Sequence, residues 1–400
     1  MQSVFVARQP IYDRSLTVIG YELLFRAAEA DRADVADGDL ATSQVILNAF
    51  TVIGLDQLVG SAKAFINLTR SFLVQEHRIP FPRERVVLEI LEDIDPDPQL
   101  IDALREIKSQ GYAIALDDFE YSSELLPLLR VADIVKLDVQ SLAGDRLAKQ
   151  VRTLRRHPVK LVAEKVETRS EFDVCLGLGF DYFQGYFLSR PDTVRSTSIP
   201  SGRLSTMNLL AALNRADVQI DELERLIAQD VSLSYKLLRY LNSAFFTTRR
   251  KIASIHQAIV YLGLEALRSW ASLLVMATVP GKPRELVVTL MVRAKMCELL
   301  ATAARLPAPG SCFTVGLFSG LDALFDAPLE RILAGLPLSD ETTAALLRHE
   351  GEQGRLLQYV LRYEKGDWES IVEQPLAAET VINAYVAAVA WANQVASSWS

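Results

Sequence analysis

The stretch Ile114-Ala115-Leu116-Asp117-Asp118-Phe119 joins an apolar run of strand character to two adjacent carboxylates. Two like charges at the end of a strand repel each other unless a cation, a turn or a ligand compensates them. Taken alone, the pair is more simply explained as a turn that opens the next helix. The same event recurs at other strand ends in the first half of the chain, and this recurrence favours a functional interpretation.

Short strand-like runs alternate with helix-like segments in this half. Apolar runs at 3–8 and 17–24 flank Tyr12-Asp13-Arg14 and predict an antiparallel hairpin. Further strands are expected at Ala64–Leu68, Val86–Ile90, Tyr112–Leu116, Ile134–Leu137 and Lys160–Ala163, and in the neighbourhood of Phe180–Phe183. Helices are expected at Gln99–Ser109, Ser123–Leu129, Arg146–Leu154 and Arg169–Leu178. About eight alternating strands predict an α/β fold, a TIM-like (β/α)8 barrel with an antiparallel opening hairpin. An open doubly wound sheet is the alternative, although no Gly-rich dinucleotide fingerprint follows the first strand.

Polar side chains stand at or directly after the carboxyl ends of these strands. They are Glu22, Asn67, Glu89, Asp117, Asp118, Lys136, Glu164 and Gln184. In a barrel these ends meet on one face, where active sites lie. Mg²⁺ or Mn²⁺ accepts hard oxygen ligands of this kind, and a pair of such ions can clamp a phosphoryl centre. Each residue alone could be a cap or a surface charge, but the joint pattern predicts one polar site.

Eight phrases of this half occur in a recognisable order. They are Gln9–Ile11, Gly20–Arg26, Phe65–Asn67, Leu88–Glu92, Leu116–Phe119, Val135–Asp138, Val162–Thr168 and Phe183–Pro191. Together they resemble the EAL domain, the cyclic di-GMP phosphodiesterase barrel. We place this domain at residues 1–192.

The resemblance implies a role for each strand-end residue. The implied metal ligands, for Mg²⁺ or Mn²⁺, are Glu22, Asn67, Glu89, Asp117 and Asp118. Lys136 would hold the nucleophilic water or a metal-bound oxygen, Glu164 would act as general base or further ligand, and Glu167 would complete the pocket. The implied contacts with cyclic di-GMP are Gln9, Gln184 and Arg26, the last through a charge-assisted bond to phosphate. The implied reaction is in-line attack on one phosphodiester to give the linear dinucleotide.

The chain also departs from the family pattern. The family runs from its paired aspartates through Phe into Gly-Thr-Gly-Tyr-Ser-Ser, whereas here Phe119 is followed by Glu120-Tyr121-Ser122-Ser123. The loop is therefore two residues shorter and lacks both glycines, which reach positive φ without penalty. Leu23 replaces a small alanine, Leu91 replaces a hydroxyl residue, and Lys165 replaces a glycine. Lys165 would neutralise part of the charge that a metal balances, so we expect binding with weak or lost hydrolysis.

The second half has a different character. Residues 193–203 are expected to form a linker, and helical periodicity dominates 204–400, which predicts an all-α domain. The phrases Asp230–Ala244 and Ile255–Gly263 resemble an HDOD domain, a relative of HD phosphohydrolases that lacks their metal site. Where an HD enzyme would carry His-Asp, this chain has Ser319 and Gly320, so no hydrolase chemistry is expected here.

The resemblance implies that this half contacts a signalling protein partner, and it allows a homodimer. Our candidate for the contact surface is Arg239–Phe246, with an ordinary buried helix end as the alternative. For the barrel, a working phosphodiesterase and a scaffold that binds nothing remain alternatives to a cyclic di-GMP binder. An enolase-like barrel with Lys136 as base carries little weight.

Composition sets the remaining limits. The net charge is −8 and no long basic run occurs, so binding to nucleic acid is not expected. The most apolar windows, near Ser272–Val279 and Val386–Ala392, are about half the ~20 residues that span a bilayer. The three cysteines are widely spaced, which argues against a disulfide framework and favours the reducing cytoplasm.

Overall fold

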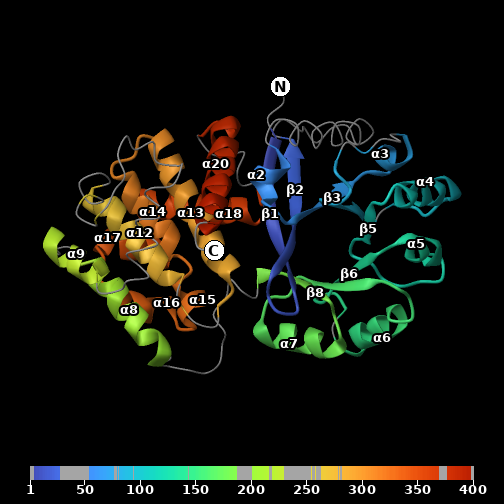
Figure 1. Ribbon diagram of the computed structural model, residues 1–400, viewed down its shortest axis with the longest axis horizontal. Helices are drawn as coiled ribbons and strands as arrows, with labels where there is room; N and C mark the ends of the chain where they lie inside the picture. Colours follow the sequence, from blue (N-terminus) through green and yellow to red (C-terminus); the bar gives the residue numbers. More distant parts are fainter. Residues whose placement is uncertain are drawn as a thin grey trace. The chain divides into compact units, whose positions relative to one another are not determined.

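The chain forms two compact units in the computed structural model (Figure 1). One unit contains Met1–Leu188 and Glu364–Gln374, and the other contains Ser189–Tyr363 and Pro375–Ser400. The structure describes residues 4–27, 54–75, 79, 81–92, 94–142, 144–186, 201–215, 219–228, 254, 257, 263–277, 279, 282–368 and 376–397.

The first unit contains a closed eight-stranded barrel, which confirms the predicted fold class and rules out the doubly wound alternative. β1 (Val4–Asp13) and β2 (Val18–Ala27) form the expected antiparallel hairpin. The strands from β2 to β8 pair in parallel, and β1 closes the barrel antiparallel to β8. The remaining strands are β3 (Lys63–Leu68), β4 (Val86–Ile90), β5 (Ala113–Leu116), β6 (Ile134–Asp138), β7 (Lys160–Glu164) and β8 (Tyr182–Gln184).

Helices connect the strands of the barrel, and some of them begin at a capping side chain. They are α2 (Leu55–Val59), α3 (Arg70–Gln75), α4 (Pro98–Ser109), α5 (Leu126–Val131), α6 (Asp145–Leu154) and α7 (Arg169–Leu178). In α4, the Asp97 side chain accepts a hydrogen bond from the Leu100 N–H. In α7, Thr168 and Glu171 form a capping box. The predicted start of α5 at Ser123 is wrong: the helix begins at Leu126, with proline in its first turn, where a missing N–H is tolerated.

The barrel interior has an apolar layer beneath a polar layer. The buried apolar layer consists of Ile11, Phe65, Val87, Ala115, Ile134 and Val162. On β2 the corresponding residue is Gly20, where an added Cβ would lie only 2.6 Å from Cε2 of Phe65. Because side chains alternate along a strand, the residues two positions further toward the site share the same face. They are Gln9, Glu22, Asn67, Glu89, Asp117, Lys136 and Glu164.

A segment from late in the chain completes the barrel unit. Trp368 stacks on Phe5 of β1, with ring centroids 5.5 Å apart and an interplanar angle of 16°. Both rings are buried. Phe5 lies on the inward face of β1, four residues before Gln9 in the sequence. The C-terminal half of the chain thus contributes a side chain to the unit that carries the polar layer.

The described part of the second unit consists of helices, as predicted. They are α8 (Ser201–Leu213), α9 (Ile220–Ala228), α12 (Leu264–Met276), α13 (Arg284–Ala303), α14 (Pro309–Phe318), α15 (Leu321–Phe325), α16 (Leu329–Ala334), α17 (Asp340–Arg348), α18 (Gly351–Glu364) and α20 (Ala378–Ser397). α8 begins at Ser201, so the last three residues of the predicted linker are helical. The rings of Trp270 and Trp391 lie 5.4 Å apart in its core. The candidate partner surface Arg239–Phe246 lies outside the described residues.

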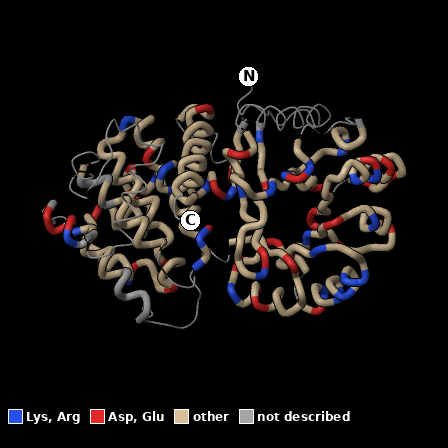
Figure 2. The backbone as a smooth tube through the Cα atoms, in the orientation of Figure 1, with Lys and Arg blue, Asp and Glu red and all other residues tan. Residues whose placement is uncertain are grey.

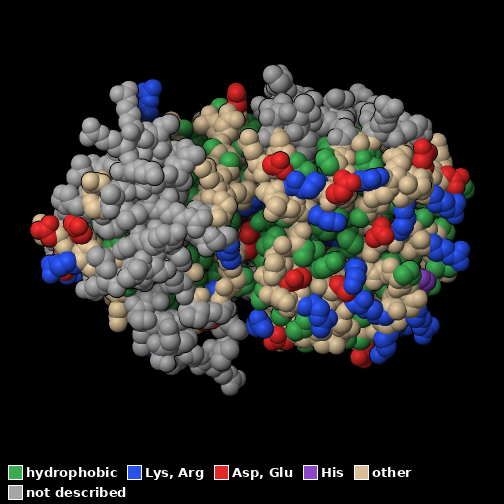
Figure 3. Space-filling view, viewed as in Figure 1, with side chains coloured by type: hydrophobic (Ala, Val, Ile, Leu, Met, Phe, Trp, Pro, Cys, Tyr) green, Lys and Arg blue, Asp and Glu red, His purple; other side chains and the backbone are tan. Residues whose placement is uncertain are grey.

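Charges of both signs intermingle along the described parts of both units (Figure 2). In the face shown in Figure 3, basic and acidic side chains lie among apolar atoms over the barrel. Within the described residues, we find no helix with the length and apolar character needed to cross a bilayer.

Candidate functional site

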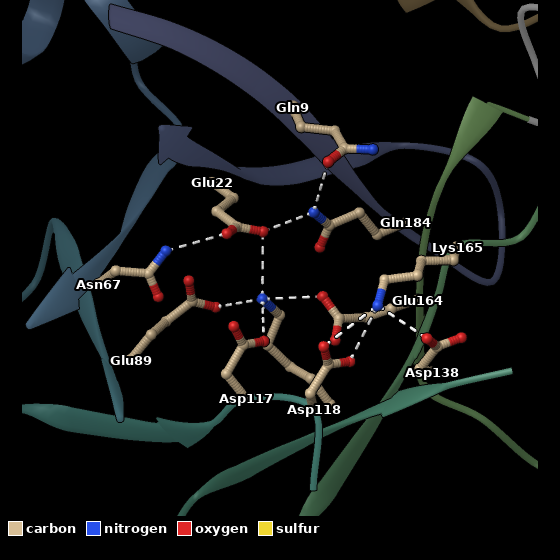
Figure 4. A network of polar contacts seen from close by, with 11 residues as sticks. Gln9, Glu22, Asn67, Glu89, Asp117, Asp118, Asp138, Glu164, Lys165 and Gln184 are labelled. Carbon is tan, nitrogen blue, oxygen red and sulfur yellow. Dashed lines mark hydrogen bonds and ion pairs between the residues drawn. The ribbon is translucent and has the colours of Figure 1, made fainter. Parts of the chain in front are cut away.

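Four carboxylates, all labelled in Figure 4, surround one buried lysine at the carboxyl ends of the barrel strands. The Lys136 Nζ lies 2.8 Å from Glu89 Oε1 and from Asp117 Oδ1, 2.9 Å from Glu164 Oε1 and 3.1 Å from Glu22 Oε2. The lysine side chain is fully buried. We call these five residues the inner cluster. Its formal charge is three negative, because one ammonium faces four carboxylates.

The pKa values of the inner cluster reflect this imbalance. Burial would lower the pKa of Lys136, but the four carboxylates raise it well above its usual value. Burial raises the pKa of Glu89 well above its usual value and that of Glu164 to about 8. Burial opposes ionisation of Glu22 as well, but Lys136 and hydrogen bonds from neighbouring amides lower its pKa. Without a further cation, the cluster therefore tends to retain a proton.

Several oxygens beside the inner cluster have no hydrogen-bond partner. They are Asn67 Oδ1, Glu89 Oε2 and Gln184 Oε1, all buried. An unsatisfied buried acceptor is costly, and a divalent cation would satisfy such oxygens. In the described chain, no group of three or more His, Cys, Asp or Glu is spaced to coordinate a metal ion. The carboxylates instead close around the lysine ammonium, while the unpaired oxygens and the excess negative charge fit a hard cation.

Two amides link the first and last strands to the inner cluster. The Nε2 of Gln184 donates to Gln9 Oε1 at 3.0 Å and to Glu22 Oε2 at 2.6 Å. Asn67 Nδ2 donates to the other oxygen of Glu22 at 3.1 Å. The glutamate is thus held by amides from two other strands, in addition to its contact with Lys136 on β6. The predicted ligand contacts Gln9 and Gln184 accordingly lie at the cluster's edge (Figure 4).

Two other predicted site residues, Arg26 and Glu167, do not belong to the inner cluster. Arg26 is half-buried on β2, four residues beyond Glu22 and opposite Phe5 of β1. Glu167 directly precedes the cap of α7, and its backbone N–H donates to Glu171 Oε2 at 2.7 Å. The structure thus gives Glu167 a place at a helix N-terminus, where an acidic side chain is favourable.

Lys165 forms a second ion-pair group next to the first. Its Nζ lies 2.7 Å from Asp138 Oδ2, and 3.1 Å and 3.4 Å from the two carboxylate oxygens of Asp118. We call these three residues the outer cluster. Asp117 and Asp118 are therefore adjacent in sequence but belong to different clusters.

Asp138 is a site residue that sequence reasoning missed. Its phrase, Val135–Asp138, was a recognised match, but the carboxylate received no role. The strand period provided a signal, because Asp138 follows Lys136 by two residues and so shares its face. The bond from Lys165 and two backbone N–H groups lower the pKa of Asp138, although burial would raise it.

Backbone bonds beyond the strand ends hold both clusters in place. The N–H of Asp117 donates to the Ile90 carbonyl at 2.9 Å, and that of Phe119 donates to the Lys136 carbonyl at 3.0 Å. Val166 N–H donates to the Gln184 carbonyl at 3.0 Å. Gly185 has φ +145°, and a Cβ there would lie 2.1 Å from the Val166 carbonyl oxygen. Only glycine fits this close approach.

The short loop after Phe119 is tied to α6. Glu120 pairs with Arg146 at 2.9 Å, and the Tyr121 N–H donates to Gln150 Oε1 at 3.1 Å. Both partners lie on α6, so the loop has two fixed contacts outside the site.

Comparisons with known proteins agree with this architecture. Residues 52–191 match the EAL domain and residues 199–327 match the HDOD domain. Over 381 residues the chain is 36% identical to "Cyclic di-GMP phosphodiesterase CdgJ" of Vibrio cholerae, covering 94% of this chain and 88% of that protein. This chain belongs to the EAL–HDOD family. The EAL and HDOD resemblances predicted from the sequence are confirmed.

Other relatives of this EAL–HDOD protein carry less functional information. "Uncharacterized protein YuxH" of Bacillus subtilis is 35% identical over 403 residues, which covers 98% of each chain. Among solved structures, Bacillus subtilis YkuI, in complex with cyclic di-GMP and calcium, has a TM-score of 0.39 and 23% identity, and covers 46% of this chain and 54% of that one. Klebsiella pneumoniae BlrP1 with manganese and cyclic di-GMP has the same TM-score and identity, covering 46% and 55%.

The matched EAL segment starts after the opening hairpin. In this EAL–HDOD protein the hairpin nevertheless closes the barrel and supplies Gln9 and Glu22 to the site. Its two strands are therefore part of the same functional unit.

Proposed function

We propose that the barrel binds cyclic di-GMP together with a divalent cation and hydrolyses it slowly. The observation that carries this proposal is the inner cluster: four strand-end carboxylates and a lysine converge beside unpaired buried oxygens. Such a site has excess negative charge, which a divalent cation would balance while it also attracts the anionic phosphodiester. Membership of the EAL family, a cyclic di-GMP phosphodiesterase family, supports this choice of ligand.

Each residue has a defined part in this proposal. The cation, Mg²⁺ or Mn²⁺, would be held by Glu22, Asn67, Glu89 and Asp117, with Asp118 as a further candidate. When bound, it would supply positive charge against the phosphate and lower the pKa of water. Lys136 would hold the attacking water. Burial raises the pKa of Glu164 to about 8, and a cation bound beside it would lower that pKa, so that the carboxylate could accept the proton of the water.

Ligand positioning would involve the side chains around the inner cluster. The amides of Gln9 and Gln184 would orient the dinucleotide, and Arg26 would donate to a phosphate oxygen. Glu167 would complete the pocket next to Glu164. The water oxygen would attack phosphorus, the bond to one ribose oxygen would break, and the product would be the linear dinucleotide.

Slow turnover is supported by the loop that follows the paired aspartates. Its contacts with Arg146 and Gln150 fix it on α6, and it lacks the glycines of the family pattern. A change in the supporting shell of a metal site lowers its activity, so we expect slow turnover.

A working phosphodiesterase is the second candidate. It is favoured by the relative named a cyclic di-GMP phosphodiesterase, which is 36% identical across most of both chains. The two candidates share the binding site and differ in turnover.

For the helical half we propose a role in contacting a signalling protein partner, with a homodimer as a further form. Its match to the HDOD domain supports this role. The described core of this half is built from apolar and aromatic side chains such as Trp270 and Trp391. We also propose a cytoplasmic location, which the three free, buried cysteines support.

Titration of the full chain with cyclic di-GMP and Mn²⁺ tests the binding proposal. We expect saturable binding that falls at least tenfold in Glu22→Gln. Lys160→Ala is the matched control, because Lys160 pairs with Asp181 near the amino end of β7. Unchanged affinity in Glu22→Gln, or no binding by the wild type, would favour a scaffold instead.

Assay of the linear product under the same conditions separates the two enzymatic candidates. We expect slow turnover in the wild type and none in Asp117→Asn. Rapid turnover would support the working phosphodiesterase.

A further inference from the structure

The outer cluster is built around a lysine side chain that reaches two carboxylates from different strands. Asp118 follows β5, Asp138 ends β6, and Lys165 directly follows β7. The ammonium lies within 3.4 Å of both oxygens of Asp118 and 2.7 Å from Asp138 Oδ2. One positive charge thus occupies the space between these carboxylates (Figure 4).

The two carboxylates of the outer cluster have different tasks. Asp138 Oδ1 accepts the backbone N–H groups of Gln140 at 2.8 Å and Ser141 at 3.2 Å, which fixes the carboxylate and leaves Oδ2 for Lys165. Asp118 presents both of its oxygens to the lysine. Asp138 therefore anchors the Lys165 ammonium, and this ammonium neutralises Asp118.

The backbone at Lys165 is also positioned for this contact. Its carbonyl accepts from Gln140 Nε2 at 3.1 Å. Both Lys165 and Asp118 have left-handed backbones, with φ +55° and +40°. Non-glycine residues adopt this region at an energetic cost, so the surrounding bonds must hold it.

Among the described residues of the site, the buried oxygens without a hydrogen-bond partner lie on its inner side. Glu89 is fully buried with Oε2 lacking a hydrogen-bond partner, and Gln184 is 3% exposed with Oε1 in the same state. Both residues line the inner cluster. The demand for a further cation thus belongs to the inner cluster, whereas both oxygens of Asp118 already face an ammonium.

We infer that Lys165 is a built-in counter-cation that withdraws Asp118 from the metal-ligand set, so that the barrel binds one divalent cation rather than a pair. This inference rests on the proposed function for the identity of the inner ligands. A pair of ions clamps both the attacking and the leaving oxygen in phosphoryl transfer. A barrel with one ion keeps an electrostatic site for the dinucleotide and loses half of that clamp, which gives slow turnover a structural cause.

Counting bound Mn²⁺ on the full chain tests the inference without a turnover assay. The readout is free Mn²⁺ by electron paramagnetic resonance in titrations without nucleotide. We expect one tight ion per wild-type chain, and two in Lys165→Gly and in Lys165→Met. Lys165→Arg retains the positive charge and should stay at one.

Lys160→Ala provides the matched control, because Lys160 also forms an ion pair with an aspartate, Asp181, at 3.1 Å. The exposure of the two lysine side chains is similar, 60% for Lys160 and 52% for Lys165. It should leave the count at one. Thermal unfolding verifies that each variant is folded, and Lys165→Gly suits the left-handed backbone.

Two ions in the wild type, or one ion in both Lys165→Gly and Lys165→Met, would overturn the inference. No bound ion in any of these proteins would overturn it as well. Cyclic di-GMP is titrated separately. A count that rises from one to two in a protein that fails to bind the dinucleotide would refute the proposed function and leave the role of Lys165 standing.

Discussion

The two lysine-centred clusters differ mainly in burial. Lys136 is fully buried among four carboxylates, whereas Lys165 is 52% exposed and faces two. Water can replace the outer lysine as a partner of its carboxylates, but it cannot reach the inner one. The same pairing chemistry therefore makes Lys136 necessary for a stable barrel and leaves Lys165 free to set the number of bound ions.

The largest difference should appear when each lysine loses its charge. In the presence of a chelator, Lys136→Met should lower the free energy of unfolding by about 3–5 kcal/mol, because it leaves buried carboxylates without their cation. Urea unfolding measures this. Mn²⁺ should restore part of the loss, since the same carboxylates can then hold a cation. A variant as stable as the wild type would remove the distinction between the clusters.

A substitution at Gly185, which packs against the Val166 backbone, should affect both clusters. Gly185→Ala should cost about 1–3 kcal/mol, because the new Cβ would clash with the backbone of Val166, the residue directly after Lys165. Thermal unfolding and Mn²⁺ counting on this variant should change together. Gly177→Ala is the control, because nothing lies within 4 Å of its added Cβ. If Gly185→Ala and Gly177→Ala had equal effects, the close packing of Gly185 against the Val166 backbone would not support the clusters.

The inner cluster should also give the chelated protein a pH dependence. Burial raises the pKa of Glu164 from 4.5 to about 8, so the folded state binds this proton more tightly than the unfolded state does. Its contribution to stability is complete below about pH 4.5 and is lost as the pH rises to about 8. Glu164→Gln should therefore show a smaller decline in unfolding free energy across this window. If unfolding free energy changed with pH equally in Glu164→Gln and in the wild type, the result would count against a buried, protonated Glu164.

The smallest expected stability effect is at the outer cluster. Lys165→Met should change the unfolding free energy by about 1 kcal/mol or less, because its ion pairs are exposed to solvent. The same substitution should alter the Mn²⁺ count. A loss as large as that of Lys136→Met would place the outer lysine in the structural role assigned to the inner one.

Much of the barrel was predictable because its local signals agree. Strand β4 and helix α7 fall at the residues expected, since apolar runs and the Thr168 cap mark them independently of tertiary structure. The start of α5 was misplaced: a helix was expected from Ser123, whereas it begins only at Leu126.

The sequence predicted which strand ends carry the residues of the candidate site, but not which of these side chains contact one another. Strand ends predicted which residues converge, because a closed barrel brings them to one face. The division of Asp117 from Asp118 could not be predicted, since it depends on the ammonium of Lys165 and on the left-handed backbones of Asp118 and Lys165. The anchoring role of Asp138 likewise depends on Lys165, which lies 27 residues away in sequence.

The most direct test is a crystal structure of the full chain with cyclic di-GMP and Mn²⁺, with ions located by anomalous scattering. The account predicts a dinucleotide phosphate over the inner cluster, one Mn²⁺ among Glu22, Asn67, Glu89 and Asp117, and Lys165 still paired with Asp118. A dinucleotide bound elsewhere, or an inner cluster without Mn²⁺ at saturating concentration, would contradict it.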